Sequence, residues 1–475
     1  MSIKKTTVDT PSWRIVGWSC HQTTSSILSI AMTFAAYLAA GGYGIAVAMA
    51  GIIATYTRLF DAFIDPFLAM ITDRVQTRFG RIRLLIVVGR SIQTLSIIAL
   101  FFWGIGKGAV VYTVIYCFYC IGSSIGAIAS HTGNPIITTN PKQRPLIFRW
   151  MLIFTTLISS FTSVYMSNVL YPKYKGLTIE AFQELALTVI AIMLIMEIIA
   201  CISISHKDKP GAFPKKKDGS NVSFKDAWNL LKGNRAMQMY VIAGVSEKVA
   251  AEAYRQAAVI TLVFGIIIGN YEFYGTFSML RIIPNILVLL FGTRMACKSG
   301  TKKALTQWAF ISMGLTVALT AFMMFMDPTQ ISVSIIPTII FSVLFLAYGA
   351  SSTVASACAN AMVPDIVDYE LARSGSFVPG TVGTMYSFID EMVSSLSTTL
   401  VGFCLTAVGY VSVQPQPGDP SSPQIFGITM FLWMGMPFLG WLITIIVMKW
   451  YPLDSEKMIE VQKINKELRE TTQTT

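Results

Sequence analysis

The sequence predicts an all-α membrane protein with twelve transmembrane helices arranged as two six-helix bundles, and three observations lead to this fold class. Of the 475 residues, 53% are hydrophobic and 13% are charged, whereas a soluble domain carries about 25% charged residues. The apolar residues gather in runs such as ALTVIAIMLIMEIIACISIS, which approach the roughly 20 residues that cross a bilayer. Basic residues concentrate in alternate loops between these runs.

The apolar runs and the polar breaks between them define the expected helices in chain order. The first run is too long for the core of a signal peptide, and no cleavage pattern accompanies it, so it is expected to remain as a helix. The twelve expected helices are 14–40, 45–71, 84–106, 109–133, 146–170, 180–205, 237–268, 275–293, 304–326, 332–358, 378–410 and 425–448.

The loops differ sharply in their basic residues, which predicts the topology. One set of alternate loops holds only Lys107, Lys173 and Lys175, while the other holds most of the arginines and lysines. The positive-inside rule then places both termini in the cytoplasm of a cell with an inner membrane, and an even helix count agrees. The net charge of +11 is therefore interpreted as topology, and no nucleic-acid partner is expected.

The predicted domains are an N-terminal bundle (1–205), a linker (206–236), a C-terminal bundle (237–448) and a cytoplasmic tail (449–475). The linker contains a short amphipathic segment with Ser223 as its N-cap. RFGRIR follows the second helix and KSGTKK follows the eighth. This echo favours the parallel repeat of a two-bundle transporter, with substrate bound near the bilayer midplane between the halves.

Charged residues inside the second helix are the clearest functional signal. Arg58, Asp61 and Asp65 are spaced i, i+3 and i+7, so they share one face of the helix. Charges at this depth are costly and mark functional sites by default. Two carboxylates offer oxygen ligands to a small cation, or one could carry a proton because repulsion and burial favour its neutral form. A buried salt bridge between helices is the structural alternative. Ser124 is placed with the two aspartates as a third cation ligand.

Other intramembrane charges leave two interpretations open. Asp390 and Glu391 form an acidic pair in the eleventh helix, and one of them is expected to face the centre. The seventh helix carries Glu247, Lys248, Glu252 and Arg255, which form either a self-neutralising ladder or a contact to substrate through Arg255 or Lys248. Single charges occur at Arg90, Glu197 and Arg281, and Arg90 is expected to snorkel to the cytoplasmic end.

Polar and aromatic residues complete a possible sugar pocket. Thr24 lies on the first helix, His131 on the fourth, and Arg149 and Trp150 at the start of the fifth. The same residue types also serve as ordinary packing residues between membrane helices. Cys117 and Cys120 form a CxxC within an apolar helix and are expected to be core residues. We expect no cofactor, no catalytic residues and no metal beyond the coupling cation.

Three stretches resemble a known transporter family. RLFDAFIDPFLAMITDRVQTRFGRIR, VPDIVDYELARSG and NPKQRP are similar to segments of the glycoside–pentoside–hexuronide:cation symporters, which include melibiose permease and belong to the major facilitator superfamily. The resemblance implies the major facilitator fold and symport of a sugar with Na⁺ or H⁺, with Asp61 and Asp65 as cation ligands and Arg149 near the sugar. We also expect the loops 73–83 and 294–303 to serve as cytoplasmic latches, with Asp73, Arg74, Arg78, Gly80 and Arg81 as the candidate gating residues.

The sequence departs from the family pattern around the sugar site. The acidic residue of the first helix is replaced near Thr24, the fourth-helix aspartate near Ala127, a neighbouring tryptophan near His131, and the eleventh-helix lysine near Glu391. A melibiose-like substrate is therefore not expected, and the change in charge affects which cation or which charge state of substrate is accepted.

The function predicted from the sequence is cation-coupled symport of a sugar or glycoside into the cell by alternating access. The monomeric protein would have a small sugar, a monovalent cation and the lipid bilayer as partners. Transport of an organic anion such as a hexuronide or a sulfonated sugar is the alternative within the same class. A membrane-embedded enzyme and an ion channel are less favoured, because the chain lacks an HExxH motif and a filter-like repeat.

Overall fold

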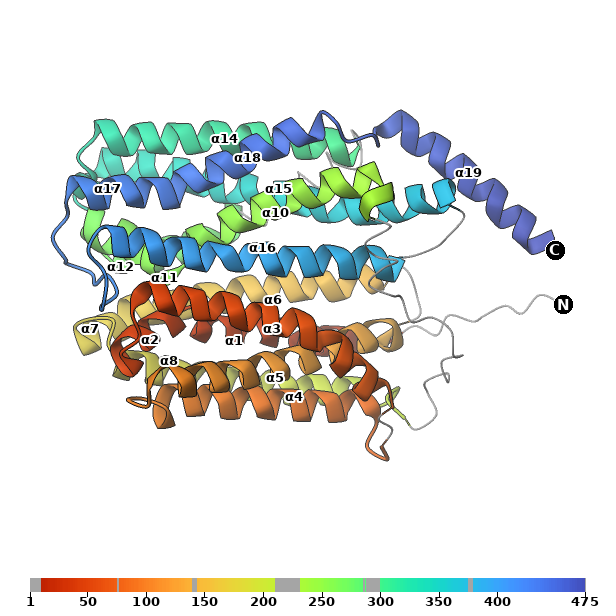
Figure 1. Cartoon of the computed structure of the whole chain (residues 1–475), viewed down its shortest axis with the longest axis horizontal. Coiled ribbons are helices and arrows are strands. Elements are labelled where there is room, and N and C mark those ends of the chain that lie inside the picture. The colour runs from red at the N-terminus through yellow and green to blue at the C-terminus, as the bar shows by residue number, and fades with distance from the viewer. Residues whose placement is uncertain are drawn as a thin grey trace. The chain divides into compact units, whose positions relative to one another are not determined.

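A computed structural model describes residues 10–74, 77–138, 143–209, 231–284, 287, 300–374 and 379–474. The chain divides into two units (Figure 1). Unit 1 comprises Met1–Lys217 with Tyr274–Met279 and Leu405–Gln416, and unit 2 comprises Asp218–Phe273, Leu280–Cys404 and Pro417–Thr475. The predicted linker falls mostly outside the described residues, as does its short amphipathic helix, so the domain boundaries stay a prediction.

The described residues form helices joined by short turns, as expected. Nine helices among them are long and apolar enough to cross a membrane, and one bent pair raises the number to ten. The two remaining predicted ranges, 275–293 and 378–410, also contain helix, although both include residues that are not fully described. The prediction of an all-helical, multi-pass membrane protein is therefore confirmed.

Unit 1 is built around α1, which packs against both α6 and α8, while α5 packs against α3 and α4. Small residues allow close approach between these helices. The backbones of α4 and α5 come so close at Gly89 and Gly122 that an added Cβ at either glycine would meet the backbone of the other helix. The helices of this unit are α1 (Ser12–Met32), α2 (Ala35–Tyr43), α3 (Val47–Arg74), α4 (Arg81–Ile98), α5 (Gly108–Ile137), α6 (Arg144–Val164), α7 (Tyr171–Tyr174) and α8 (Ile179–Ile204), with π-helical segments at Ala99–Trp103 and Tyr165–Leu170.

In unit 2, α14 packs against α15 and α18, and α10 packs against α18. The tail helix α19 lies on α15, where Val461 is buried and Asn465 Nδ2 donates to the Asp368 carbonyl oxygen at 2.9 Å. The helices associated with this unit are α10 (Arg235–Arg255), α11 (Ala257–Ile260), α12 (Glu272–Leu280), α14 (Thr301–Phe325), α15 (Ile335–Ser374), α16 (Pro379–Ala407), α17 (Pro423–Met430), α18 (Met436–Met448) and α19 (Ser455–Thr474), with π-helical segments at Thr261–Ile267 and Phe431–Gly435 and a 3₁₀ turn at Pro328–Ser332. The unit assignment splits α12 and the end of α16 between the two units.

The seventh predicted helix is broken at one residue. Gln256 has an extended backbone, with φ −64° and ψ 139°, between α10 and α11. The two parts are bent by 57°. Breaks of this kind leave backbone groups free at membrane depth and occur where protein or a cavity surrounds them.

The start of α4 is capped from a distant part of the chain. Asp208 is fully buried, and its carboxylate accepts the backbone N–H groups of Arg81, Ile82 and Arg83 at 2.9, 3.2 and 2.9 Å. Gly80 precedes them with φ +97°, and any Cβ there would collide with Asp208. A negative charge on the free N–H groups of a helix start is favourable, so Asp208 fixes the loop that precedes α4.

Replacing Asp208 with alanine should lower the thermal unfolding midpoint of the purified protein. The substitution leaves three buried N–H donors without their acceptor, and loss of a cap costs about 1–2 kcal/mol. Tryptophan fluorescence during heating in detergent measures the effect. Glu456→Ala, which removes an exposed carboxylate from α19, is the control, and equal midpoints for the two variants would contradict the capping role.

Candidate functional site

The acid cluster, defined as Asp61, Asp65 and Ser124, lies between α3 and α5 in unit 1. Helical spacing places both aspartates on the face of α3 that packs against α5. Ser124 of α5 is buried, and its Oγ donates to Asp61 Oδ1 at 2.6 Å. The structure therefore brings together the three residues that were predicted as cation ligands.

The acid cluster holds more acceptors than donors. The Ser124 hydroxyl has a single proton, which it donates to Asp61. Asp65 Oδ1 is buried and has no hydrogen-bond partner among the described residues. An ionised carboxylate has only acceptor oxygens. The spare oxygen is therefore a place where a cation or a proton would bind.

An arginine, a histidine and one hydroxyl lie near the acid cluster. Arg58 interacts electrostatically with Asp61, and His131 interacts in the same way with Asp65. Tyr116 is buried on α5 beside Arg58 and Asp61. Tyr116 was not among the residues predicted from the sequence, although it precedes Ser124 by eight residues, about two turns of α5.

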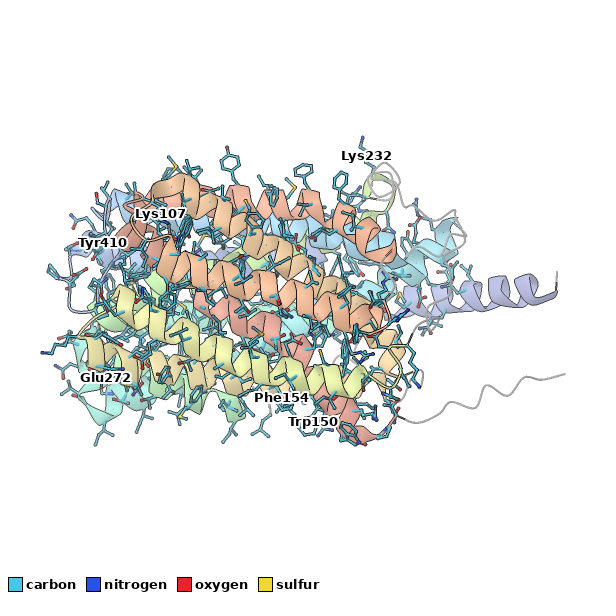
Figure 2. All side chains as sticks on the ribbon, turned by 90° about the horizontal axis from the view of Figure 1, so that it is seen from below. Lys107, Trp150, Phe154, Lys232, Glu272 and Tyr410 are labelled. Atoms are coloured by element: carbon cyan, nitrogen blue, oxygen red, sulfur yellow. The ribbon has the colours of Figure 1, made fainter. Side chains whose placement is uncertain are left out.

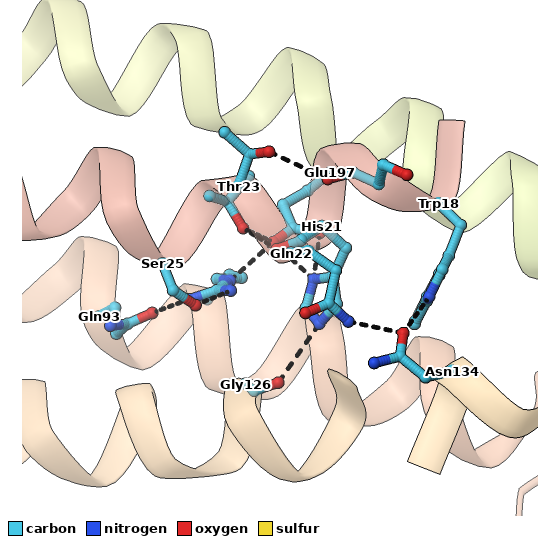
Figure 3. A network of polar contacts seen from close by, with 12 residues as sticks. Trp18, His21, Gln22, Thr23, Ser25, Gln93, Gly126, Asn134 and Glu197 are labelled. Atoms are coloured by element: carbon cyan, nitrogen blue, oxygen red, sulfur yellow. Dashed lines mark hydrogen bonds and ion pairs between the residues drawn. The ribbon is translucent and has the colours of Figure 1, made fainter. Parts of the chain in front are cut away.

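The clamp is a second polar group in unit 1, formed by His21, Arg90 and Glu197 from α1, α4 and α8 (Figure 3). All three residues are buried, with exposed fractions of 0%, 3% and 6%. His21 Nδ1 lies 2.9 and 2.8 Å from the two carboxylate oxygens of Glu197, and Nε2 lies 3.3 Å from the Gly126 carbonyl oxygen on α5. The ring therefore joins α1 to both α8 and α5.

All three nitrogens of the Arg90 guanidinium donate hydrogen bonds within unit 1. Nε donates to Glu197 Oε1 at 2.6 Å, NH1 to Gln93 Oε1 at 2.5 Å, and NH2 to Ser25 Oγ at 2.9 Å. The expectation that Arg90 snorkels to the cytoplasmic end is therefore wrong. Its partner Glu197 lies 107 residues away in the sequence, and no local pattern indicates such a pair.

Thr24 belongs to the clamp in this structure. Its side chain is fully buried, and its hydroxyl contacts the His21 carbonyl oxygen at 2.7 Å and Glu197 Oε1 at 2.5 Å. The neighbouring Gln22 and Trp18 both donate to Asn134 Oδ1, at 2.7 and 2.8 Å. These polar residues of the first helix are thus hydrogen-bonded within unit 1, and sugar binding by Thr24 stays a prediction.

The remaining predicted residues of unit 1 are spread along the chain. Arg149 is exposed on α6, and Trp150 packs against Phe154 with ring centroids 5.7 Å apart (Figure 2). Of the predicted latch, Arg78 is exposed, and Gly80 and Arg81 belong to the start of α4 that Asp208 caps. The side chains of Asp73 and Arg74 lie outside the described residues.

In unit 2, Arg255 is the last residue of α10 and is exposed, and it lines a cavity together with Arg281. Glu391 is half-buried on α16, while the side chain of Asp390 lies outside the described residues. The predicted ladder is incomplete, because within the described chain no ion pair joins Glu252 to Lys248 or Arg255.

Residues of the motif VPDIVDYELARSG join two helices of unit 2. Glu370 is buried, and its carboxylate accepts from Asn234 Nδ2 at 2.7 Å and from Arg373 NH2 at 2.9 Å. Asn234 in turn caps α10 by accepting the Met237 N–H at 3.0 Å. The end of α15 is therefore fastened to the start of α10.

Comparison with known proteins assigns the chain to a family. The family described as MFS/sugar transport protein matches residues 16–455. An uncharacterized symporter, YnaJ of Bacillus subtilis (strain 168), is 21% identical over 430 residues, which covers 87% of this chain and 86% of that protein. The glucuronide carrier protein homolog of Escherichia coli (strain K12) is 20% identical over 472 residues, covering 95% of this chain and 94% of that protein. The predicted resemblance to melibiose permease-like symporters is confirmed.

Solved structures with the same fold cover nearly the whole chain. The nucleoside transporter NupG has a TM-score of 0.57 at 12% identity, covering 92% of this chain and 100% of that chain. A bacterial homologue of the iron transporter ferroportin, in an inward-facing state, has a TM-score of 0.60 at 10% identity, covering 93% and 98%. These similarities confirm the major facilitator fold.

Breaking the clamp from one side should destabilise the protein more than removing the charged pair. Glu197→Leu leaves the Arg90 guanidinium buried without its counter-charge and His21 without its carboxylate partner, and the expected loss is about 3–5 kcal/mol. The double variant Arg90→Met/Glu197→Leu removes both charges of the pair and should be more stable than Glu197→Leu alone. Thermal unfolding of the purified variants in detergent measures the order.

The control for the clamp lies on the same helix. Glu184→Leu removes a carboxylate of α8 whose ion pair with Lys173 is partly exposed, and pairs of this kind contribute little. A double variant as unstable as Glu197→Leu, or a Glu184→Leu variant that loses as much stability, would show that charge pairing is not what holds the clamp.

Proposed function

Because the chain belongs to the MFS/sugar transport protein family, a family of transporters and not of enzymes, we propose that it carries a sugar or glycoside across the membrane together with a monovalent cation. The observation that carries the proposal is the acid cluster. The Ser124 hydroxyl donates to Asp61, and a buried Asp65 oxygen has no donor among the described residues. A positive ion is the ligand that this arrangement lacks.

Either Na⁺ or H⁺ could be the coupling ion. The oxygens of Asp61, Asp65 and Ser124 are the hard ligands that small cations prefer, a preference documented for other hard ions. A proton on Asp65 would instead supply the donor that its buried oxygen lacks and would remove one of two neighbouring negative charges. Arg58 would compensate the carboxylates when no cation is bound.

Coupling follows if the cation changes the affinity for sugar. A ligand shifts a conformational equilibrium only through its different affinity for the two states. We infer that cation binding at Asp61 and Asp65 favours the state that binds sugar, and that both ligands cross by alternating access. The same proposal includes import across a bacterial inner membrane, cytoplasmic termini, a monomeric protein and a latch at residues 73–83.

The sugar contacts of this proposal are polar and aromatic side chains. Arg58, His131, Arg149 and Trp150 are the candidates in unit 1, and Arg255 and Glu391 are those in unit 2, with Asp390 outside the described side chains. Hydroxyl groups of a sugar would accept hydrogen bonds from the arginines, and its apolar face would stack on Trp150. The family and the relative named a glucuronide carrier homolog support a sugar or a glycoside in general.

Asp61→Asn and Asp65→Asn should each abolish gradient-driven accumulation of sugar. Each variant removes a negative charge that attracts the cation, so the gradient no longer transmits its free energy to the sugar. Uptake into vesicles with an imposed Na⁺ or H⁺ gradient is the measurement, and at least a tenfold fall is expected from loss of one charge-assisted contact. Exchange of sugar at equal concentrations on both sides should decline less.

Asp327→Asn is the matched control, because Asp327 makes local contacts to Thr329 in an exposed turn and lies far along the chain from the acid cluster. Ser124→Ala should give an intermediate effect, since it removes one oxygen ligand and no charge. Undiminished accumulation in both aspartate variants would remove the acid cluster from coupling.

A further inference from the structure

The end of unit 1 where α1 begins and α8 ends carries several basic side chains and one exposed tryptophan. Helices α1 and α8 pack closely against each other, and an added Cβ at Gly17 of α1 would meet the Ser203 and Ile199 side chains of α8. The two chain segments are therefore neighbours in space. The residues that they bring together, which we call the basic patch, are Trp13, Arg14, His206, Lys207 and Lys209.

Three hydrogen bonds hold the cations of the basic patch in place. Arg14 NH1 donates to the Ser203 carbonyl oxygen at 3.4 Å. Lys207 Nζ donates to Thr10 Oγ1 and to the Ile137 carbonyl oxygen, both at 2.9 Å. All three acceptors are uncharged, so these contacts position the side chains and leave their positive charge without a counter-charge.

No carboxylate balances the basic patch among the residues that the structure describes. Asp208 is adjacent in the sequence, but its carboxylate accepts the backbone N–H groups at the start of α4 and pairs with Arg83 Nε at 3.4 Å. Within the same residues, no ion pair is formed by Arg14, Lys207 or Lys209. The patch therefore has an excess of positive charge that a ligand could neutralise.

The surroundings of His206 show how closely the positive charges lie. Burial lowers the pKa of His206, and the charges of three neighbouring side chains lower it further, those of Arg14, Lys207 and Lys209. Like charges at this range disfavour one another's charged forms. An anion placed among them would relieve the repulsion.

Two side chains of the basic patch keep donors for such an anion. A guanidinium has several N–H donors, and the described residues accept one hydrogen bond from Arg14, the contact to Ser203. The Arg14 Cζ atom lies 4.7 Å from the centre of the Trp13 ring, which orients the guanidinium. Lys209 is exposed, and its ammonium group forms no hydrogen bond within the described part of the chain. Arginine and lysine are the usual ligands of a phosphate group.

The neighbourhood of the basic patch is apolar on the membrane side. Trp13 is 55% exposed, and tryptophans in membrane proteins concentrate at the level of the lipid headgroups. Ile202 and Ile198 precede His206 by four and eight residues and are 56% and 61% exposed. A soluble anion would contact the charges alone, whereas a lipid with its phosphate on the patch would also lay its acyl chains along these isoleucines.

We propose that the basic patch binds the headgroup phosphate of an anionic phospholipid, held by Arg14 and Lys209 beside Trp13, with the acyl chains along the outer face of α8. Basic pockets between membrane helices are suited to such headgroups. A zwitterionic lipid brings a positive group of its own to a patch that already has an excess of cations, so it is the poorer ligand. The proposed topology places this lipid in the cytoplasmic leaflet, and the site does not depend on symport.

Competition between two lipids tests the charge preference of the full-length protein. The purified chain in detergent is titrated with phosphatidylglycerol or with phosphatidylcholine of the same acyl chains, and bound lipid is counted by native mass spectrometry. The wild type should bind phosphatidylglycerol at least about fivefold more tightly, the contribution of one basic side chain near an anionic lipid surface.

Arg14→Gln and Lys209→Gln should each weaken binding of phosphatidylglycerol by about fivefold, and the double variant by about 25-fold. Binding of phosphatidylcholine should change by less than about twofold. Lys303→Gln is the matched control, because it removes the same charge from an exposed position at the start of α14. Thermal unfolding in detergent verifies that each variant is folded.

Fluorescence quenching locates the lipid on the protein. Phosphatidylglycerol with brominated acyl chains should quench Trp13, and the difference between the wild type and Trp13→Phe gives the share of that one residue among the nine tryptophans. This share should be quenched less in the double variant and less by brominated phosphatidylcholine.

Four results would overturn the basic patch as a lipid site. They are equal affinity of the wild type for the two lipids, folded glutamine variants that bind phosphatidylglycerol as the wild type does, an equal loss in Lys303→Gln, and displacement of the lipid by inorganic phosphate at the same concentration. The third would indicate a general effect of surface charge, and the fourth would indicate a site for soluble anions.

Discussion

Compensation of charge at membrane depth is the constraint on which the rest of the structure depends. A charged side chain near the bilayer centre costs roughly 3 kcal/mol or more unless a partner or water receives it. The clamp meets this cost within the protein, because Arg90 and His21 both contact Glu197. The clamp thereby joins three helices of unit 1 and leaves none of its charges for a ligand.

The acid cluster is compensated only in part. Asp65 keeps a buried oxygen without a donor among the described residues, and a cation is the ligand that would meet this need.

The sequence was sufficient to predict features that depend on residues close together in the chain. Asp61 and Asp65 share a face through helical periodicity alone, and hydropathy and charge placement predict the membrane helices. Arg90 and His21 could not be interpreted in this way, because Glu197 lies 107 and 176 residues away and their pairing depends on how helices pack. The sequence left the charges of the seventh helix open between an internal ladder and a contact to substrate, and the break at Gln256 has no local signal in the sequence.

Reciprocal binding tests the central claim most directly. If Asp61 and Asp65 hold the coupling cation, the cation must raise the affinity for sugar by the same factor by which sugar raises the affinity for the cation, since coupling between two binding sites is symmetric. Calorimetry on the purified protein, with sugar titrated at several Na⁺ and H⁺ concentrations and the reverse, measures both factors. We expect equal factors of about 5–150 in the wild type and factors near one in Asp61→Asn. Sugar affinity that is independent of both ions in the wild type would contradict the account.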